Sequence, residues 1–193
     1  MKRITVFCGS SFGTDQIFEE QAYLLGKTLT NKKIGLVYGG AKVGLMGRVA
    51  DGAMDNGGEV IGVLPHFLGS KEIAHENLTE LIWVESMHER KTKMNDLCDG
   101  VIALPGGFGT LEEVFEMLTW AQLGLHQKPI AFLNINGFYN ELFALLRTMV
   151  TKGFLKEVNE SMVLSGSHID DLLQKMESYQ APAVGKWIKK EEV

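Results

Sequence analysis

The densest group of chemistry-bearing residues in this sequence is Leu104–Glu113, which reads Leu-Pro-Gly-Gly-Phe-Gly-Thr-Leu-Glu-Glu. It follows a strand predicted over Val101–Leu104 and opens a helix predicted over Thr110–Leu123. Glycines let the backbone turn sharply and let a ligand come close. The free N–H groups and positive dipole end of a helix form an anion site, and phosphate is the natural ligand. A plain turn capped by Thr110 is the alternative, but three glycines and a proline exceed what a cap needs.

Two carboxylates, Glu112 and Glu113, fall in what the pattern predicts to be the first turn of that helix. A carboxylate beside a bound phosphate is unfavourable unless a cation offsets it or the chemistry requires it. The pair therefore either stabilises the helix dipole or places a catalytic acid beside the ligand. The residue pattern leaves both interpretations open.

A second segment, Met87–Met94, carries the cations Arg90, Lys91 and Lys93 in the first half of a helix predicted over Met87–Leu97. Positive charge near a helix N-terminus opposes the macrodipole and costs a few tenths of a kcal/mol or more for each charge. Cations placed against the helix dipole, with no local interaction that compensates the cost, indicate that the residues are kept for a function. A solvated basic face, partly balanced by Glu89, is the alternative.

Glycines gather in two further strand-to-helix turns. Gly9 and Gly13 follow the first predicted strand, and the segment Tyr38–Gly47 follows the second. The second turn is a candidate for another wall of a ligand cleft. Close packing of a helix on a strand explains Gly44 and Gly47 equally well.

Short apolar runs alternate with amphipathic stretches along the chain. The predicted strands are Ile4–Cys8, Ile34–Tyr38, Glu59–Leu64, Leu81–Val84, Val101–Leu104, Ile130–Leu133 and Met162–Leu164. The predicted helices are Gln16–Leu29, Leu45–Met54, Met87–Leu97, Thr110–Leu123, Phe138–Met149 and Ile169–Met176. Continuous Val/Ile/Leu strands indicate burial on both faces. We therefore expect an α/β fold, a Rossmann-like doubly wound parallel sheet with helices on both faces and its ligand beyond the carboxyl ends of the strands.

Composition excludes several classes of protein. The 193 residues carry 19 Lys+Arg against 24 Asp+Glu, a net charge of −5, so no basic stripe for nucleic acid is expected. No apolar run is long enough to span a membrane, and the apolar start of the chain is too short for a signal peptide. Cys8 and Cys98 are expected to be free buried thiols in a reducing cytoplasm. The length predicts one domain, residues 1–180, with a loosely attached tail, residues 181–193.

Four familiar motifs are not matched by this sequence. Gly26-Lys27-Thr28 lacks the upstream glycine of a phosphate-binding P-loop and lies within a predicted helix. The first turn has no G-x-G-x-x-G and the second strand ends without a carboxylate, which disfavours NAD. Ser10 lacks the glycine spacing of a hydrolase elbow, and the five histidines show no metal-binding spacing. We expect neither a metal nor another cofactor.

The residues at 105–113 match the pattern P-G-G-x-G-T-x-x-E, and Arg90-Lys91 stands 23 residues before Glu113. Together these motifs resemble the LONELY GUY family, the cytokinin riboside 5′-monophosphate phosphoribohydrolases, often mislabelled lysine decarboxylases. The resemblance spans nearly the whole chain. It is specific for the family and less specific for the substrate.

The resemblance implies hydrolysis of the N-glycosidic bond of a nucleoside 5′-monophosphate, a cytokinin riboside 5′-monophosphate or AMP, to free base and ribose 5-phosphate. It implies Arg90 and Glu113 as the catalytic pair, and a homodimer with its sites near the interface. The candidate substrate-binding residues, from the resemblance and the glycine turns together, are Ser10, Gly39, Gly40, Glu72, Met87, Lys91, Gly106, Gly107, Phe108, Gly109, Thr110, Glu112 and Thr119.

The chemistry agrees with these roles. Cleavage of the glycosidic bond builds positive charge on the ribose, and Glu113 would stabilise it or activate water. Arg90 would orient the carboxylate or the ribose, because arginine does not give up its proton. Pyridoxal phosphate chemistry needs a Schiff-base lysine, and no lysine here is singled out for it. A non-catalytic nucleotide or cofactor carrier, similar to the molybdenum-cofactor carrier proteins, is the alternative.

Overall fold

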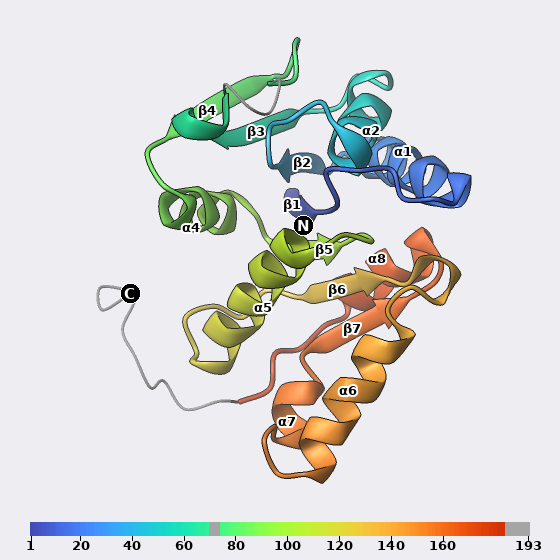
Figure 1. The fold of residues 1–193 in the computed structure, drawn as a ribbon, viewed down its shortest axis with the longest axis vertical. Helices are drawn as coiled ribbons and strands as arrows, with labels where there is room; N and C mark the ends of the chain where they lie inside the picture. The colour runs from blue at the N-terminus through green and yellow to red at the C-terminus, as the bar shows by residue number, and fades with distance from the viewer. Residues whose placement is uncertain (70–73, 184–193) are drawn as a thin grey trace.

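The computed structural model describes residues 1–69 and 74–183 of the chain. Its centre is a seven-stranded sheet in the order β4-β3-β2-β1-β5-β6-β7 (Figure 1). The strands are β1 (Arg3–Phe7), β2 (Gly35–Tyr38), β3 (Val60–Pro65), β4 (Glu80–Val84), β5 (Gly100–Ala103), β6 (Ile130–Leu133) and β7 (Val163–Gly166). Every neighbouring pair is parallel, so the predicted parallel α/β sheet is confirmed.

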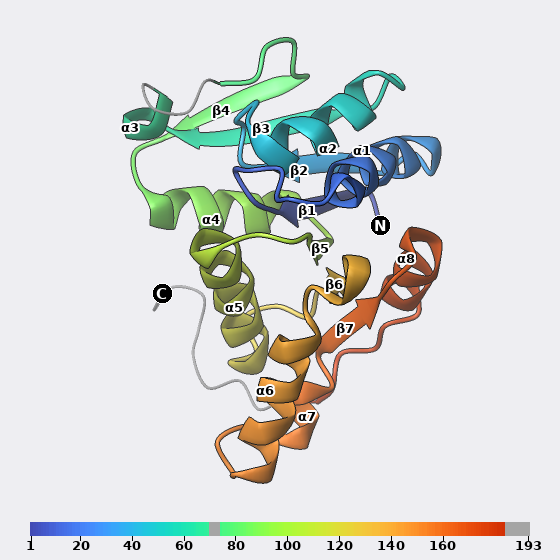
Figure 2. The same cartoon turned by 45° about the vertical axis from the view of Figure 1, so that its right-hand side comes forward.

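Helices cover both faces of this sheet (Figures 1 and 2). They are α1 (Gln16–Asn31), α2 (Gly44–Met54), α3 (His66–Gly69), α4 (Met87–Leu97), α5 (Phe108–Gln122), the 3-10 helix η1 (Ile135–Gly137), α6 (Asn140–Thr151), α7 (Glu157–Glu160) and α8 (Ile169–Glu177). Side chains of α1, α2 and α8 form one hydrophobic core, and side chains of α4 and α5 form the other. β1 supplies Ile4 and Val6 to the first core and Phe7 to the second, so both faces of the strand are buried. Its one buried polar residue, Thr5, donates its hydroxyl to Met94 O at 3.0 Å.

The strand order reverses beside β1. The chain runs outward from β1 through β2 and β3 to β4, then crosses back so that β5 pairs with the other edge of β1, Ile4 opposite Gly100. At this point Leu104 N donates to Phe7 O at 2.9 Å, and Gly9 N donates to Pro105 O at 3.0 Å. The first and third glycine turns therefore lie side by side at the switch point, where open α/β sheets bind ligands.

Two local predictions about the third turn are wrong. The helix begins at Phe108 and not at Thr110, and because Gly107 is its N-cap, the alternative of a turn capped by Thr110 is wrong as well. Glu112 and Glu113 consequently lie in the second turn of α5, beyond the positions where a carboxylate favours the dipole most. Elsewhere α3 and α7 were not predicted, because four-residue helices have no periodicity to detect.

Several other expectations concern residues away from the site. Lys27 is exposed on α1, as expected for a helix-surface lysine. Cys8 and Cys98 are free and buried, as predicted. In the described ranges, none of the helices has the length and apolar character needed to cross a lipid bilayer. Of the predicted tail, residues 184–193 lie outside the described residues, as does Glu72.

Candidate functional site

The start of α5 offers backbone N–H groups to a ligand. Leu111 N donates to Gly107 O at 3.1 Å, which is the first intrahelical bond of this helix. The amides of Phe108, Gly109 and Thr110 precede it, so they are the donors that an α-helix leaves without an intrahelical partner. Free amides at the positive dipole end of a helix can bind an anion, and here they lie at the switch point.

Each glycine of this turn has its own surroundings. A Cβ on Gly106 would lie 2.1 Å from Thr110 Oγ1, so glycine is required there by the protein's own packing. A Cβ on Gly107 or Gly109 would meet no atom of the described residues within 4 Å. Packing does not explain these two glycines. Glycine at these two positions leaves the approach to the backbone amides open.

The start of α4 is fixed by a reciprocal cap. Ser86 Oγ accepts from Glu89 N at 3.1 Å, and a Glu89 carboxylate oxygen accepts from Glu85 N at 2.8 Å. This arrangement is close to a capping box, which the pattern Ser-x-x-Glu at 86–89 carries in the sequence. Because the cap fixes where the helix starts, it also fixes the face on which Arg90 lies.

Arg90 is buried and its guanidinium makes contacts in three directions. Nε donates to Val63 O at 3.1 Å and Nη2 donates to Gly39 O at 3.3 Å, at the carboxyl ends of β3 and β2. Nη1 lies 3.3 Å from Glu113 Oε1. A Cβ on Gly39 would lie 2.1 Å from Nη2, so glycine at this position makes room for the arginine. The predicted alternative of a solvated basic face is wrong for Arg90 and Lys91, which are buried, although Lys93 is exposed.

The Arg90–Glu113 ion pair joins α4 to α5 beneath the strand ends. Both side chains are almost fully enclosed, with 8% and 10% exposed. Cys8, at the end of β1, senses both charges: burial raises the pKa of its thiol, Glu113 raises it further and Arg90 partly opposes them. Cys8 is therefore held as a neutral thiol, which is a poor nucleophile.

Lys91 forms a second charged connection between the same helices. Its Nζ contacts Glu112 Oε1 and lies 2.9 Å from Glu116 Oε2. Burial acts to lower the pKa of Lys91, but the bonds to Glu112 and Glu116 outweigh it and raise the pKa above its usual value. The ammonium is therefore held charged. Sequence reasoning missed Glu116, although its spacing of four residues from Glu112 places both on one face of α5.

The structure brings most of the predicted site residues together, but not all of them. Met87 is half-buried with its sulfur 3.9 Å from Arg90 Nη1. Ser10 is exposed, and its backbone is the neighbour that leaves no room for a Cβ on Gly44. Gly44 therefore allows close approach of the first turn rather than of a strand. Thr119 is exposed one and a half turns beyond Glu113, and its hydroxyl donates to Phe115 O at 2.8 Å, away from the loop.

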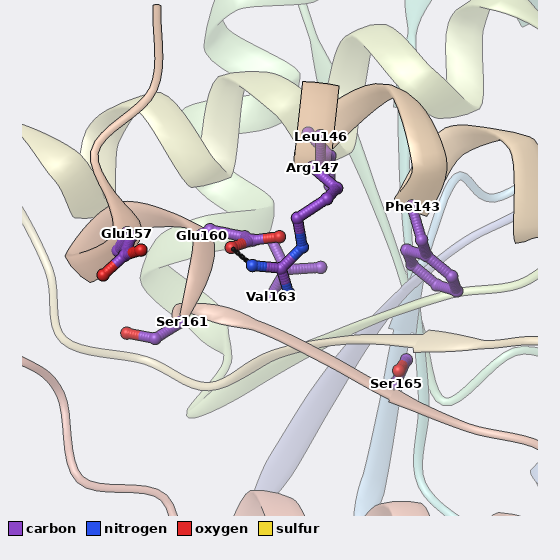
Figure 3. Close-up of a pocket in the computed structure, with 8 residues that line it drawn as sticks. All are labelled: Phe143, Leu146, Arg147, Glu157, Glu160, Ser161, Val163 and Ser165. Carbon is purple, nitrogen blue, oxygen red and sulfur yellow. Dashed lines mark ion pairs between the residues drawn. The ribbon is translucent and has the colours of Figure 1, made fainter. Parts of the chain in front are cut away.

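A cavity of about 200 Å³ lies between the first and third turns, lined by Gly9, Ser11, Pro105 and Gly107. Phe12, Phe18 and Phe138 also line it, and sequence reasoning did not predict them. A larger cavity of about 350 Å³ lies between α6, α7 and β7 (Figure 3). Arg147 and Glu160 pair there at 3.0 Å, so their charges offset each other, and the cavity contains no residue of the glycine turns. A third cavity, of about 440 Å³, is lined by residues of β7 and α8, among them Gly166, Asp171 and Lys175. Volume therefore does not identify the site; of these three cavities, only the first contains residues of the glycine turns.

The contrast between glycines gives a test of the anion site. We expect Gly109→Ala to keep or raise the melting temperature, because alanine is the better helix former by about 1 kcal/mol. Its affinity for inorganic phosphate should fall, since the new methyl group occupies the approach to the amides. Gly106→Ala should instead destabilise the protein by about 1–3 kcal/mol through its collision with Thr110. Calorimetric titration with phosphate measures the affinity, and thermal melts measure the stability. Normal phosphate affinity in Gly109→Ala would contradict an anion site at the first-turn amides of α5.

Comparison with known proteins adds an independent observation. A family model described as "Possible lysine decarboxylase" matches residues 46–176. The chain is 44% identical over 179 residues to cytokinin riboside 5′-monophosphate phosphoribohydrolase LOG7 of Arabidopsis thaliana, covering 93% of this chain and 82% of that protein. It is 42% identical over 178 residues to LOG2 of the same plant, which bears the same enzyme name, covering 92% of this chain and 84% of that protein.

Solved structures share the fold. The molybdenum cofactor binding protein of Rippkaea orientalis superimposes with a TM-score of 0.68 at 26% identity, over 92% of this chain and 97% of that one. The molybdenum cofactor carrier protein of Chlamydomonas reinhardtii superimposes with a TM-score of 0.69 at 19% identity, over 92% of this chain and 98% of that one. At 19% identity, the similarity to the Chlamydomonas reinhardtii protein concerns the fold alone.

Proposed function

This chain belongs to the family of cytokinin riboside 5′-monophosphate phosphoribohydrolases, and from that premise we propose that it hydrolyses the N-glycosidic bond of a nucleoside 5′-monophosphate. The products are the free base and ribose 5-phosphate. The substrates are cytokinin riboside 5′-monophosphates, AMP, or both. We call residues 106–110, the glycine turn and the first residues of α5, the phosphate loop. The observation that carries this proposal is the buried Arg90–Glu113 pair, which lies one helical turn from the backbone amides of this loop.

The spacing of these groups suits the substrate. Gly109 and Glu113 are four residues apart on α5, about 6 Å along the axis at 1.5 Å per residue. In a nucleoside 5′-monophosphate, one methylene group and the furanose ring separate the phosphate from C1′. A phosphate on the first-turn amides therefore brings C1′ toward the carboxylate of Glu113.

The chemistry then needs a negatively charged protein group close to C1′. As the bond from C1′ to the base breaks, the bonding electrons leave with the base and the ribose gains oxocarbenium-like positive charge. The Glu113 carboxylate stabilises that charge and orients the water whose oxygen bonds to C1′. That water gives up one proton and the departing base takes up one, so that free base and ribose 5-phosphate are formed. Arg90 stays protonated, because a guanidinium does not give up its proton in a protein, so it positions Glu113 rather than transferring a proton.

The remaining binding roles are part of this proposal. The backbone of the phosphate loop contacts the phosphate, while Lys91 and Glu112 contact the substrate from α4 and α5. The complete set that we propose for substrate binding is Ser10, Gly39, Gly40, Glu72, Met87, Lys91, Gly106, Gly107, Phe108, Gly109, Thr110, Glu112 and Thr119.

Amino-acid decarboxylation, which the description of the family model suggests, does not suit the lysine at this site. A Schiff-base lysine attacks as the neutral amine, which requires a lowered pKa. Glu112 and Glu116 raise the pKa of Lys91 and hold it as the ammonium ion. Lys91 is therefore suited to binding and not to Schiff-base formation.

The test is a product assay. The protein is incubated with AMP, with isopentenyl-AMP and, as the matched control, with adenosine, and released base and ribose 5-phosphate are quantified by chromatography. We expect base and ribose 5-phosphate in equal amounts from a monophosphate and far slower release from adenosine, which lacks the phosphate that the loop binds. Tight nucleotide binding without any released base would contradict the enzyme and favour the carrier.

We also propose that the protein acts as a homodimer with its sites near the interface. Phe108 is 95% exposed, and Leu111, Phe115 and Leu118 on α5 are only partly buried, which supports an apolar contact along this helix. Thr119 lies on α5 about 9 Å from Glu113, so we propose that it reaches the site of the second copy. A monomer in sedimentation velocity at concentrations that turn over substrate would contradict this proposal.

Residues 1–180 form one nucleotide-binding domain in this proposal, with residues 181–193 as its tail. The free, buried thiols of Cys8 and Cys98 support a reducing compartment, so we propose the cytoplasm as its location.

A further inference from the structure

The backbone carbonyl of Leu104 is bound by a side chain from a later part of the chain. Tyr139 lies between η1 and α6, and its hydroxyl donates to Leu104 O at 2.5 Å across 35 residues of sequence. Both residues are buried, and burial raises the pKa of Tyr139, so the hydroxyl stays protonated and remains a donor. A buried acceptor without a donor costs free energy. The bond therefore lets β5 end at Ala103 and the chain turn into the glycines.

Tyr139 is itself held in place by the end of the next strand. Its backbone N donates at 2.7 Å to Oδ1 of Asn134, the residue that follows β6. Its ring packs edge to face with Phe132 and with Phe138, with ring centroids 4.9 Å apart in each pair. A ring held in this way directs its hydroxyl to one place. Since β6 pairs with β5, Tyr139 ties the end of one strand to the end of its neighbour.

The bond lies at the entrance to the phosphate loop. Leu104 O belongs to the planar peptide that joins Leu104 to Pro105, so the bond from Tyr139 fixes the orientation of that plane. The proline ring then restricts the next rotation, φ, to about −65°. The following carbonyl, Pro105 O, accepts from Gly9 N at 3.0 Å, which fixes the second peptide plane. Two successive peptides before Gly106 are therefore anchored, one by Tyr139 and one by the first glycine turn.

We propose that Tyr139 is a positioning residue for phosphate binding: its hydroxyl holds the Leu104–Pro105 peptide and thereby keeps the amides of the phosphate loop where the 5′-phosphate of the substrate binds. The inference rests on the proposed function, because it takes the substrate to be a nucleoside monophosphate. Tyr139 does not itself contact the ligand. It acts through the backbone that leads into the loop.

The variant Tyr139→Phe tests this role, since it keeps the packed ring and removes only the hydroxyl. With the entrance to the loop released, the dissociation constant of inorganic phosphate and the KM for AMP should each rise about 3- to 10-fold, the value of one hydrogen bond. We expect kcat to stay within about 2-fold, because the phosphate is bound alike in the ground state and the transition state. Calorimetric titration with phosphate and steady-state kinetics measure these constants.

Thr5→Val is the matched control for a loss of stability alone. The Thr5 hydroxyl is also buried and also donates to a backbone carbonyl, Met94 O at 3.0 Å, but that carbonyl lies in α4 and not at the loop. Both variants should lower the melting temperature, whereas only Tyr139→Phe should weaken phosphate binding. An unchanged phosphate dissociation constant in Tyr139→Phe, or an equal rise in Thr5→Val, would overturn the inference.

Asn134→Ala gives a second test, which also serves if Tyr139→Phe does not fold. It removes the acceptor that holds the backbone N of Tyr139, so the phosphate dissociation constant should rise in the same direction by less. Added to Tyr139→Phe, it should weaken phosphate binding no further, because its effect passes through the missing hydroxyl. Additive effects would contradict the role of Tyr139. Phosphate binding without any base release by the unmodified protein would instead overturn the proposed function.

Discussion

Glu113→Gln should lower kcat for monophosphate hydrolysis by about 10²- to 10⁴-fold, the range for a side chain that acts in the transition state. Glutamine has the shape of glutamate and still accepts a hydrogen bond from Arg90, but it is neutral when positive charge develops on the ribose. Because the lost interaction strengthens only in the transition state, the KM should change little. Steady-state kinetics with AMP measure both constants.

The controls for this variant separate chemistry from folding and binding. The melting temperature should fall, because the variant leaves the buried Arg90 charge without its counter-ion, but the protein should stay folded and bind ribose 5-phosphate about as well as the unmodified protein. Glu177→Gln, which removes a carboxylate that is exposed on α8, should leave kcat unchanged. A Glu113→Gln protein with full kcat would remove Glu113 from the mechanism, even if the enzyme itself is active.

Arg90→Lys should lower kcat about 100-fold, although it conserves the charge. Lysine is a point charge, whereas the planar guanidinium of Arg90 contacts Val63 O, Gly39 O and Glu113 together. An ammonium cannot make these contacts in the same plane, so the Glu113 carboxylate shifts, and a misplacement of about 1 Å costs about 10²-fold in rate. Measurement of kcat for AMP, alongside a thermal melt, tests this expectation.

Two comparisons sharpen the Arg90 experiment. Lys93→Gln removes a cation from the exposed side of the same helix, and its activity should equal that of the unmodified protein. Gly39→Ala should resemble Arg90→Lys, since its methyl group would collide with Nη2. An Arg90→Lys protein with normal kcat would mean that only the charge of Arg90 matters, and that its geometry does not.

Much of this architecture is predictable from the sequence because the signals are local. The uninterrupted apolar strands indicate a sheet that is buried on both faces, and β1, with Ile4 and Val6 in one core and Phe7 in the other, has that burial. The glycines at 106–109 indicate a turn before a helix. The cations of the 87–94 segment break the dipole rule, and the structure gives the reason in the buried contacts of Arg90 and Lys91.

The parts that were missed or wrong depend on long-range contacts or on short elements. Thr110 looked like a helix cap because threonine favours that position, yet the helix starts two residues earlier at Phe108. Glu116 gives no signal in isolation, because its role depends on a lysine from α4. Thr119 is a binding residue that the family resemblance implies, but its hydroxyl donates to Phe115 O within the same helix. The contacts of a single chain give no reason for Thr119 to be a binding residue.

The pairing of β1 with β5 has a consequence for how the enzyme becomes active after synthesis. Ile4 and Gly100 are neighbours in the sheet but stand nearly a hundred residues apart in the chain. Closing so long a loop is slow compared with forming helices, so this strand pair belongs to the later events of folding. The pairing of β1 with β5 brings the first and third turns together, so that Gly9 N donates to Pro105 O. Recovery of catalysis during refolding should therefore lag behind recovery of helical structure. During synthesis, the chain should not hydrolyse nucleotides until β5 has been synthesised and has paired with β1.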